Sequence, residues 1–318
     1  MGCPSVLPVG GLACLGAQAF DLQGHRGARG LLPENTLAGF ERALEIGVTT
    51  LELDIAVTAD GVAVISHDAH LHPALTRDAQ GRWLQGKGPL IRSLTLAQLQ
   101  GYDVGRLDPG SAYARDFPTQ QPRDGERVPT LSALFDRVKA RGADQVRFAI
   151  ETKIHPNRPN DSPGVEAFVD AILAVVREHG MVARTRLISF DWRTLKRVRE
   201  IEPAIETTCI TVENPQGDNT RFPPMMAGMQ RQDYASVAHM AKAVGCAAWS
   251  PSANNLDAER VRAARALGLQ VLPWTVNDEA TMERLIGWRV DGLITDYPDR
   301  ARAVMQRAGI ALPTPPAR

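Results

Sequence analysis

Short apolar and β-branched runs alternate along the chain with amphipathic segments of about ten to fifteen residues, a pattern typical of repeated strand and helix units around a parallel sheet. The predicted strands cover 20–24, 50–57, 147–151, 186–190, 206–211, 246–250, 270–275 and 292–295. The predicted helices cover 36–46, 130–141, 163–178, 192–200, 233–244, 256–267, 278–287 and 298–308. Eight such units predict an α/β fold, a (β/α)8 TIM barrel over residues 20–310 with a tail at 311–318.

One connection breaks this pattern, because about seventy residues separate the second strand from the next helix. It starts with Asp60-Gly61, a strong turn signal that is followed by an apolar run and therefore predicts a hairpin. A two-residue turn would pair residue 57 with 64 and place His67 directly opposite Asp54. We expect 68–129 to form a small insertion over one rim, with a helix at 95–100. A mobile loop is the alternative for 105–127.

The charge balance bears on partners, because 36 Lys and Arg residues oppose 36 Asp and Glu residues. A net charge of zero removes the bulk attraction to phosphate backbones, which argues against nucleic acid and favours a small-molecule partner held by a local site. No run reaches the roughly 18 apolar residues that a membrane span needs. The sequence sets no oligomeric state.

Residues 1–19 carry no charged side chain and end in Ala17-Gln18-Ala19, the small-x-small pattern that a signal peptidase cuts. This predicts an export signal and a periplasmic or secreted location. The absence of a basic residue near the start leaves a cytoplasmic location as the alternative. After such a cut, Cys209 and Cys246 would be the remaining cysteines, and they could pair in an oxidising compartment.

Acidic side chains gather where the predicted strands end, the place where active sites of such barrels lie. Glu52 and Asp54 are two positions apart on one strand and therefore face the same way, and the apolar residues between them suit the helix-packed side. Glu151 ends a neighbouring strand. An all-carboxylate set suits a hard cation, Mg²⁺ or Ca²⁺. The alternative is an acidic cluster paired with Arg26 or Lys153.

Two histidines are expected at the same rim, His25 from the first strand and His67 from the hairpin. Two imidazoles beside a cation site suit phosphodiester cleavage, since one can take a proton from the attacking oxygen and the other can protonate the leaving alkoxide. Lys153 shares strand parity with Glu151, and its compact ammonium suits a phosphate oxygen. An ordinary solvated lysine is the alternative.

Seven blocks of the sequence together carry a family resemblance. They are Gln23-Gly24-His25-Arg26-Gly27, Leu32-Pro33-Glu34-Asn35-Thr36, Leu51-Glu52-Leu53-Asp54, Ile65-Ser66-His67-Asp68, Ile150-Glu151-Thr152-Lys153, Pro273-Trp274-Thr275-Val276-Asn277 and Asp291-Gly292-Leu293-Ile294-Thr295-Asp296-Tyr297-Pro298. From about residue 21 to 300 the chain resembles the glycerophosphodiester phosphodiesterase family. That family has a (β/α)8 barrel with an insertion after the strand that bears the metal-binding acids, and its periplasmic and secreted members carry export signals.

The resemblance also implies roles for particular side chains. The implied acid/base pair is His25 and His67, and the implied ligands of one divalent cation, Mg²⁺ or Ca²⁺, are Glu52, Asp54 and Glu151. The implied substrate contacts are Arg26 and Lys153 to the phosphate, Trp274 beside the glycerol and Phe190 in the pocket wall, with Glu34 supporting the site by hydrogen bonding. For Trp274 and Phe190, core or rim packing is the alternative.

We therefore expect metal-dependent hydrolysis of glycerophosphodiesters, such as glycerophosphocholine or glycerophosphoethanolamine, to sn-glycerol 3-phosphate and an alcohol. Either water or the substrate's own 2-hydroxyl could be the nucleophile. A phospholipase D acting on lysophospholipid or sphingomyelin is an alternative, which predicts an apolar groove in the insertion. A barrel that binds glycerophosphodiesters without cleaving them is another, which predicts a missing histidine or acid.

Overall fold

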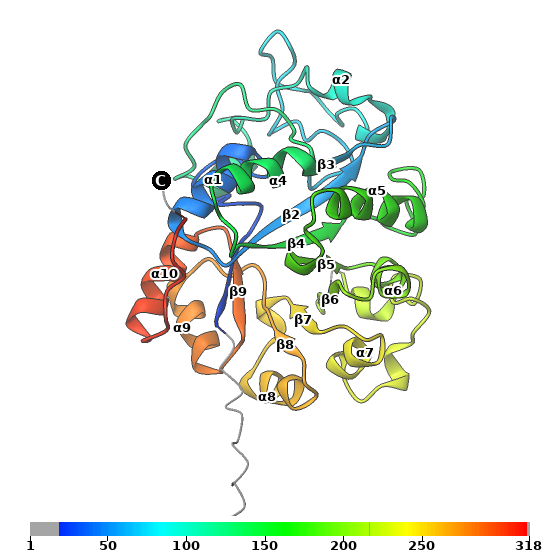
Figure 1. Cartoon of the computed structure of the whole chain (residues 1–318), viewed down its shortest axis with the longest axis vertical. Helices are drawn as coiled ribbons and strands as arrows, with labels where there is room; N and C mark the ends of the chain where they lie inside the picture. The colour runs from blue at the N-terminus through cyan, green and yellow to red at the C-terminus, as the bar shows by residue number, and fades with distance from the viewer. Residues whose placement is uncertain (1–18, 216, 317–318) are drawn as a thin grey trace, which may run out of the picture.

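The strands of the chain form one sheet that closes into a barrel in the computed structural model, which describes residues 19–215 and 217–316 (Figure 1). The order around the barrel is β8-β7-β6-β5-β4-β2-β1-β9, and the paired strands along it are parallel. Backbone hydrogen bonds from Asp291 N to Val271 O and from Ile294 N to Pro273 O, both 3.0 Å long, connect the last strand to β8. The strands are β1 Asp21–Gly24, β2 Thr50–Val57, β3 Ala63–Ile65, β4 Arg147–Thr152, β5 Thr185–Ser189, β6 Glu206–Thr211, β7 Ala248–Pro251, β8 Gln270–Val271 and β9 Gly292–Thr295.

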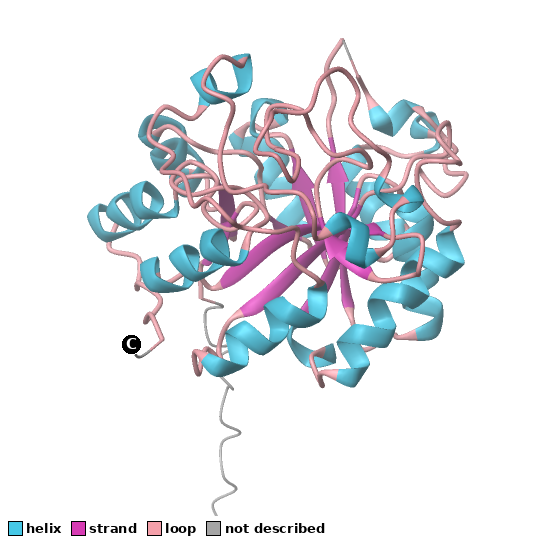
Figure 2. Cartoon of the chain, turned by 90° about the horizontal axis from the view of Figure 1, so that it is seen from above, coloured by secondary structure: helices cyan, strands magenta, loops and turns pink. Residues whose placement is uncertain are grey.

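Helices surround the strands (Figure 2). The α-helices are α1 Leu37–Ile46, α2 Leu96–Leu99, α3 Ala112–Asp116, α4 Leu131–Ala140, α5 Val165–Glu178, α6 Trp192–Ile201, α7 Val237–Ala243, α8 Ala258–Ala266, α9 Glu279–Gly287 and α10 Pro298–Arg307. Short 3-10 helices are η1 Ile91–Ser93, η2 Val182–Arg184, η3 Asn219–Arg221, η4 Arg231–Asp233 and η5 Ala253–Asn255. Side-chain caps fix several starts: Thr36, for example, accepts from Gly39 N and Asp191 accepts from Arg193 N. The predicted (β/α)8 barrel is confirmed.

The two faces of β2 have different surroundings, as its alternating pattern predicts. Leu51, Leu53 and Ile55 are fully buried in the large core between the strands and the helices. Glu52 and Asp54 have the opposite parity and point inward. The barrel interior also holds a small apolar cluster from the neighbouring strands, consisting of Ala149, Ile188 and Ile210. The inward face of β2 therefore places two carboxylates next to this inner apolar cluster.

The hairpin after β2 forms, but its predicted register is wrong by one residue. Val57 pairs with Ala63, and Ile55 pairs with Ile65. The turn has three residues instead of two: Thr58 N donates to Val62 O at 3.1 Å, and Gly61 takes the left-handed conformation with φ of 80°. The backbone oxygen of Asp54 accordingly accepts from Ser66 N at 2.9 Å. His67 is therefore one step past the position directly opposite Asp54.

The insertion lies at the end of the barrel toward which β2 points (Figure 1). It has an apolar core of its own, formed by Ala56, Val64, Leu71, Ile91, Leu99 and Val128. The helix expected at 95–100 is α2, whose start carries a capping box between Thr95 and Gln98. The segment 105–127 contains the helix α3 and an ion pair of 2.6 Å between Arg106 and Asp124. This segment thus has regular structure and defined contacts.

Two further findings concern the predicted location. Cys209 on β6 and Cys246, just before β7, form a disulfide. Within the described part of the chain, no helix combines the length and the apolar character that crossing a membrane requires. The predicted export signal at 1–19 lies, apart from residue 19, outside the described residues.

Candidate active site

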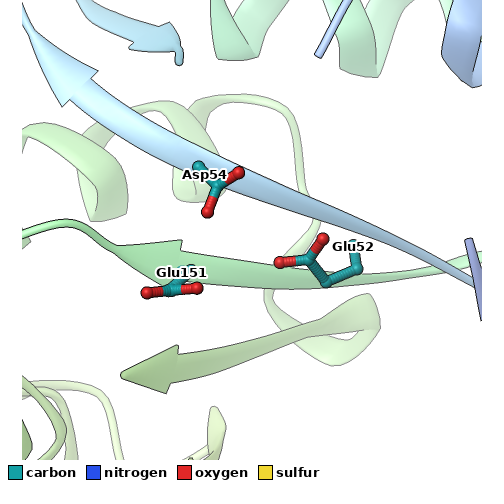
Figure 3. A group of neighbouring side chains, drawn as sticks. All are labelled: Glu52, Asp54 and Glu151. Atoms are coloured by element: carbon teal, nitrogen blue, oxygen red, sulfur yellow. The ribbon is translucent and has the colours of Figure 1, made fainter. Parts of the chain in front are cut away.

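Three buried carboxylates meet at adjacent positions of β2 and β4 (Figure 3). The parallel register places Asp54 beside Glu151 and Glu52 beside Ala149. One ligand oxygen from each of the three acids lies within 4.8 Å of the others. The predicted convergence of Glu52, Asp54 and Glu151 is therefore present in the structure.

The electrostatics of this cluster suit a cation. Burial raises the pKa of Glu52 well above its usual value, and the neighbouring Asp54 and Glu151 add to the rise. Asp54 Oδ2 accepts from Asn35 Nδ2 at 2.9 Å, whereas Asp54 Oδ1 is buried without a hydrogen-bond partner among the described residues. Such an orphaned oxygen is costly unless a ligand satisfies it. A set of three carboxylates with one free oxygen fits a hard divalent cation.

Two basic side chains also contact the acids, as the ion-pair alternative predicts. Lys153 Nζ lies 2.8 Å from Glu151 Oε1 and 3.6 Å from Asp54 Oδ1. Arg26 Nε lies 3.4 Å from Asp54 Oδ2. These two positive charges oppose three carboxylates, so one negative charge remains when all five groups are ionised. The ion pairs accordingly leave a deficit of positive charge in the cluster.

Arg26 is held by the turn that follows β1. Its backbone N–H donates to Glu52 Oε2 at 2.8 Å, and its Nη1 donates to Glu34 Oε1 at 2.7 Å. Arg26 has a φ of 50°, which is uncommon for a residue with a side chain. Gly27 follows with a φ of 89°, and a Cβ there would lie 2.7 Å from the carbonyl carbon of Gly39. The tight turn thus packs against α1 and fixes the guanidinium beside the acids.

His25 is oriented by a carboxylate from the opposite end of the sequence. Its Nδ1 lies 2.6 Å from Asp296 Oδ1, directly after β9, and its Nε2 lies 3.9 Å from Glu52 Oε2. Although burial alone would raise it, His25 and Arg29 hold the pKa of Asp296 well below its usual range. Asp296 is therefore an ionised acceptor, and Nδ1 carries the proton. This tautomer leaves the lone pair of Nε2 directed at the acidic cluster.

The charge state of the imidazole agrees with this assignment. Burial, together with the nearby Arg29, lowers the pKa of His25 to about 4, against the opposing effect of Asp296. Arg29 donates to Asp296 through Nε at 2.8 Å and through Nη2 at 3.0 Å. Asn277 Nδ2 donates to the other carboxylate oxygen at 2.7 Å. Asp296 is thus fixed by three neighbours, and His25 is neutral near pH 7.

His67 approaches from the insertion and also has a carboxylate partner. Its Nδ1 lies 2.9 Å from Asp68 Oδ1, and about a third of its side chain, 32%, is exposed. Burial alone would raise the pKa of Asp54, but the neighbouring His67, Lys153 and Arg26 hold it well below its usual range. His67 lines a cavity of about 260 Å³ together with Glu151, Lys153 and Phe190. The hairpin therefore brings His67 to the site despite the shifted register.

The sequence matches the model of the glycerophosphoryl diester phosphodiesterase family over residues 25–300. The chain belongs to this family. Members of this family are phosphoric diester hydrolases, and the chain is therefore an enzyme of this class. Every residue assigned to the site by sequence lies within the matched segment.

Relatives from several bacteria agree with this membership. The chain is 32% identical over 280 residues to a glycerophosphodiester phosphodiesterase of Bacillus subtilis, covering 86% of this chain and 83% of the relative. A crystal structure from Silicibacter pomeroyi DSS-3, described under the same family name, has 36% identity and a TM-score of 0.84, covering 93% of this chain and 96% of that one. A phosphodiesterase of Oleispira antarctica, solved with its product sn-glycerol-3-phosphate, shares the fold at 23% identity and a TM-score of 0.66, covering 90% and 96%.

The two aromatic residues assigned to this family site pack against one another. The rings of Phe190 and Trp274 meet edge to face, with centroids 5.2 Å apart. Lys153 Nζ lies 5.9 Å from the centroid of Phe190, and Trp274 Nε1 donates to Ser250 O at 3.0 Å. Both rings contact the inner apolar cluster of the barrel. They therefore pack on the apolar side chains inside the barrel, and Phe190 also lines the cavity that contains His67.

Several polar residues of the site were not assigned from the sequence, among them Asp68, Asp296 and Tyr113. Asp68 follows His67 directly, and Asp296 follows the last strand next to β1, so both had a positional signal. Tyr113 lies on α3 of the insertion and donates to Glu34. Nothing in the local sequence pattern relates residue 113 to residue 34.

Proposed function

We propose that this protein hydrolyses glycerophosphodiesters, such as glycerophosphocholine and glycerophosphoethanolamine, to sn-glycerol 3-phosphate and an alcohol in a metal-dependent reaction. One observation carries the proposal: three buried carboxylates meet beside two histidines, and each histidine contacts a carboxylate through Nδ1. Family membership supports the class of reaction. The structure supports the assignment of roles that follows.

The residues that would hold a divalent cation, Mg²⁺ or Ca²⁺, are Glu52, Asp54 and Glu151. When bound there, such an ion supplies positive charge that neutralises the phosphoryl oxygens. Two features support this role: Asp54 Oδ1 is buried without a hydrogen bond, and three carboxylates face only two basic side chains. Arg26 and Lys153 stand beside the same acids and bring two donors toward the phosphate.

His25 and His67 divide the proton transfers in this proposal. His25 keeps the lone pair of Nε2 on the side of the acids because its Nδ1 proton is donated to Asp296. It therefore takes the proton from the attacking oxygen, either water or the substrate's 2-hydroxyl. His67 lines the open cavity and is the more exposed of the two, so it protonates the departing alcohol.

The cavity beside the acids supports a small, polar substrate. The other residues that line it with the site are Asp68, Ala69, Thr152, Ile154, His155, Arg158, Asp161, Ser162 and Met225. The carboxylates, imidazoles and basic side chains of this lining suit the charged phosphate and the hydroxyl groups of a glycerophosphodiester. In this proposal the glycerol end lies against Phe190 and Trp274. All the histidines and acids expected of a catalyst are present, which disfavours a barrel that only binds.

We also propose that the protein is exported. The disulfide between Cys209 and Cys246 supports this location, because such bonds persist in oxidising compartments. The small-x-small pattern at the end of residues 1–19 supports it independently. Fractionation of cells that express the full chain, with sequencing of the mature N-terminus, tests this proposal. A protein that keeps its first residues in the cytoplasm would contradict it.

The experiment that tests the function measures release of sn-glycerol 3-phosphate across headgroups. Glycerophosphocholine, glycerophosphoethanolamine and lysophosphatidylcholine are each incubated with the purified protein. We expect release from the first two and little from the third. Free choline from lysophosphatidylcholine would instead indicate the phospholipase D, and binding without any product would indicate the non-catalytic barrel.

A further inference from the structure

The insertion places one tyrosine hydroxyl inside the polar network of the barrel rim. Tyr113 OH donates to Glu34 Oε2 and accepts from Arg29 Nη1 at 3.2 Å. Its ring contacts the rings of His72 and Phe117, with centroids 5.4 and 5.3 Å away. The hydroxyl therefore enters the network from a side chain that is already fixed by packing.

On one side, this hydroxyl completes the partners of Glu34. The carboxylate is buried and uses Oε1 for Arg26 and Oε2 for Tyr113. Arg26 is the residue proposed to contact the phosphate. Loss of the tyrosine hydroxyl would leave one buried carboxylate oxygen without this partner and free Glu34 to rotate away from Arg26.

On the other side, the hydroxyl completes the partners of Arg29. This guanidinium uses Nε and Nη2 for Asp296 and Nη1 for Tyr113, and it also stacks over Phe117 at 4.7 Å. Asp296 in turn holds His25. The donors of a planar guanidinium are fixed relative to one another. A contact that orients Nη1 of Arg29 therefore also orients the two donors that hold Asp296.

We infer that Tyr113 is a positioning residue that couples the phosphate-binding Arg26 to the His25–Asp296 pair through Glu34 and Arg29. This inference rests on the proposed function. The insertion then contributes to catalysis through one hydroxyl, without touching the reacting atoms. Burial raises the pKa of Tyr113, and Glu34 adds to the rise, so the hydroxyl remains a donor throughout the neutral range.

The test compares Tyr113→Phe with Tyr102→Phe. Tyr102 also belongs to the insertion, where it packs against the apolar core that includes Leu99 and Val128. We expect Tyr113→Phe to lower kcat/KM by about 5- to 50-fold, as loss of a hydrogen bond to a charged group does, and to lower Tm by a few degrees, because a buried carboxylate oxygen loses a partner. Tyr102→Phe should remain within about twofold of the wild type in kcat/KM.

A double-mutant cycle with Glu34→Gln separates positioning from a merely structural role. If Tyr113 acts through Glu34, the loss in the double variant is smaller than the product of the two single losses. Additive losses, an unchanged kcat/KM in Tyr113→Phe, or an equal loss in Tyr102→Phe would each overturn the inference. If Tyr113→Phe lowers Tm, the cycle is measured at a temperature where all four proteins remain folded by circular dichroism.

Binding of inorganic phosphate, followed by calorimetry, provides a readout that needs no turnover. We expect Tyr113→Phe to bind phosphate several-fold more weakly, because Arg26 loses its fixed orientation, and Tyr102→Phe to bind like the wild type. A wild type that releases no sn-glycerol 3-phosphate would refute the proposed function, whereas the phosphate comparison would still decide the role of Tyr113. Equal phosphate affinities in the two variants would refute that role.

Discussion

Asp296 accepts a hydrogen bond of 2.6 Å from His25 across almost the whole length of the chain, because β1 and β9 are neighbours in the barrel. The carboxylate sets which ring nitrogen carries the proton. The geometry of this one pair therefore supports the role of base that we propose for His25.

Replacing Asp296 by Asn should invert this arrangement. The amide can donate to Nδ1, which would move the proton to Nε2 and remove the lone pair that faces the acids. We expect kcat to fall by roughly 10- to 1,000-fold, measured as release of sn-glycerol 3-phosphate. Asp299→Asn, an exposed acid on α10, is the matched control and should keep wild-type turnover. Normal activity of Asp296→Asn would remove the tautomer from the mechanism.

Replacing His67 by Ala should remove the group that we propose protonates the leaving alcohol. We expect kcat to fall by roughly 10² to 10⁴-fold while the affinity for sn-glycerol 3-phosphate is largely kept. His239→Ala, at an exposed position of α7, controls for loss of an imidazole. If His67→Ala turned over at the wild-type rate, His67 would have no part in proton transfer.

Chelation should stop the reaction. We expect EDTA to abolish hydrolysis and Mg²⁺ or Ca²⁺ to restore it, because three carboxylates with a free Asp54 oxygen require positive charge. Thermal shift gives an independent readout: the cation should raise the Tm of the wild type and of Glu178→Gln but not that of Glu151→Gln. Full activity after exhaustive chelation would refute the cation site.

Asp21, at the end of the barrel opposite the acidic cluster, should make the free energy of unfolding decrease at acid pH. It is buried, accepts from Thr49 and Thr50 at 2.7 and 2.6 Å, and pairs with Arg147 at 3.2 Å. Although burial opposes the change, Arg147 and these hydroxyls lower the pKa of Asp21. Its contribution is therefore present above the unfolded pKa of about 4 and is lost as the pH falls toward the lower folded pKa.

We accordingly expect Asp21→Asn to lower the free energy of unfolding by about 1–3 kcal/mol at pH 7, measured in urea. The difference from the wild type should shrink as the pH falls below about 4. Asp144→Asn, an exposed acid, should follow the wild-type curve. A gap between Asp21→Asn and the wild type that stays constant down to pH 2 would contradict the assignment.

Removing the disulfide should destabilise the barrel without altering its chemistry. We expect the double variant Cys209→Ser, Cys246→Ser to lose about 2–4 kcal/mol of unfolding free energy, because the bond restricts the unfolded chain. Its kcat at a temperature well below Tm should match the wild type. Peptide mapping that finds both thiols free in the wild-type protein, purified without reductant, would refute the bond.

Much of the fold could be predicted because hydrophobic periodicity determines it. The limits of β2 at Thr50 and Val57 follow from uninterrupted alternation. The strand expected at 270–275 ends at Val271, because Pro273 lacks the N–H that would continue the ladder. The helix expected at 233–244 starts at Val237, because Ser236 caps it and the preceding residues form η4. Local chemistry of single residues thus set the boundaries that periodicity missed.

The acids of the site could be predicted because strand parity fixes where they point, as for Glu52 and Asp54. The network around them could not, because loops have no such parity. Tyr113 meets Glu34 across 79 positions, and Arg29 meets Asp296 across 267. Whether these side chains touch depends on the path of the insertion and on barrel closure, which no local pattern encodes.

The insertion leaves and re-enters the barrel at adjoining points. Val64 forms an antiparallel bridge with Thr130, and Ile65 N donates to Pro129 O at 2.8 Å. No strand of the barrel lies between these two anchors. Transplanting this segment between relatives should exchange the rim contacts around Arg29 and Glu34, together with His67, while the acids on β2 and β4 stay in register.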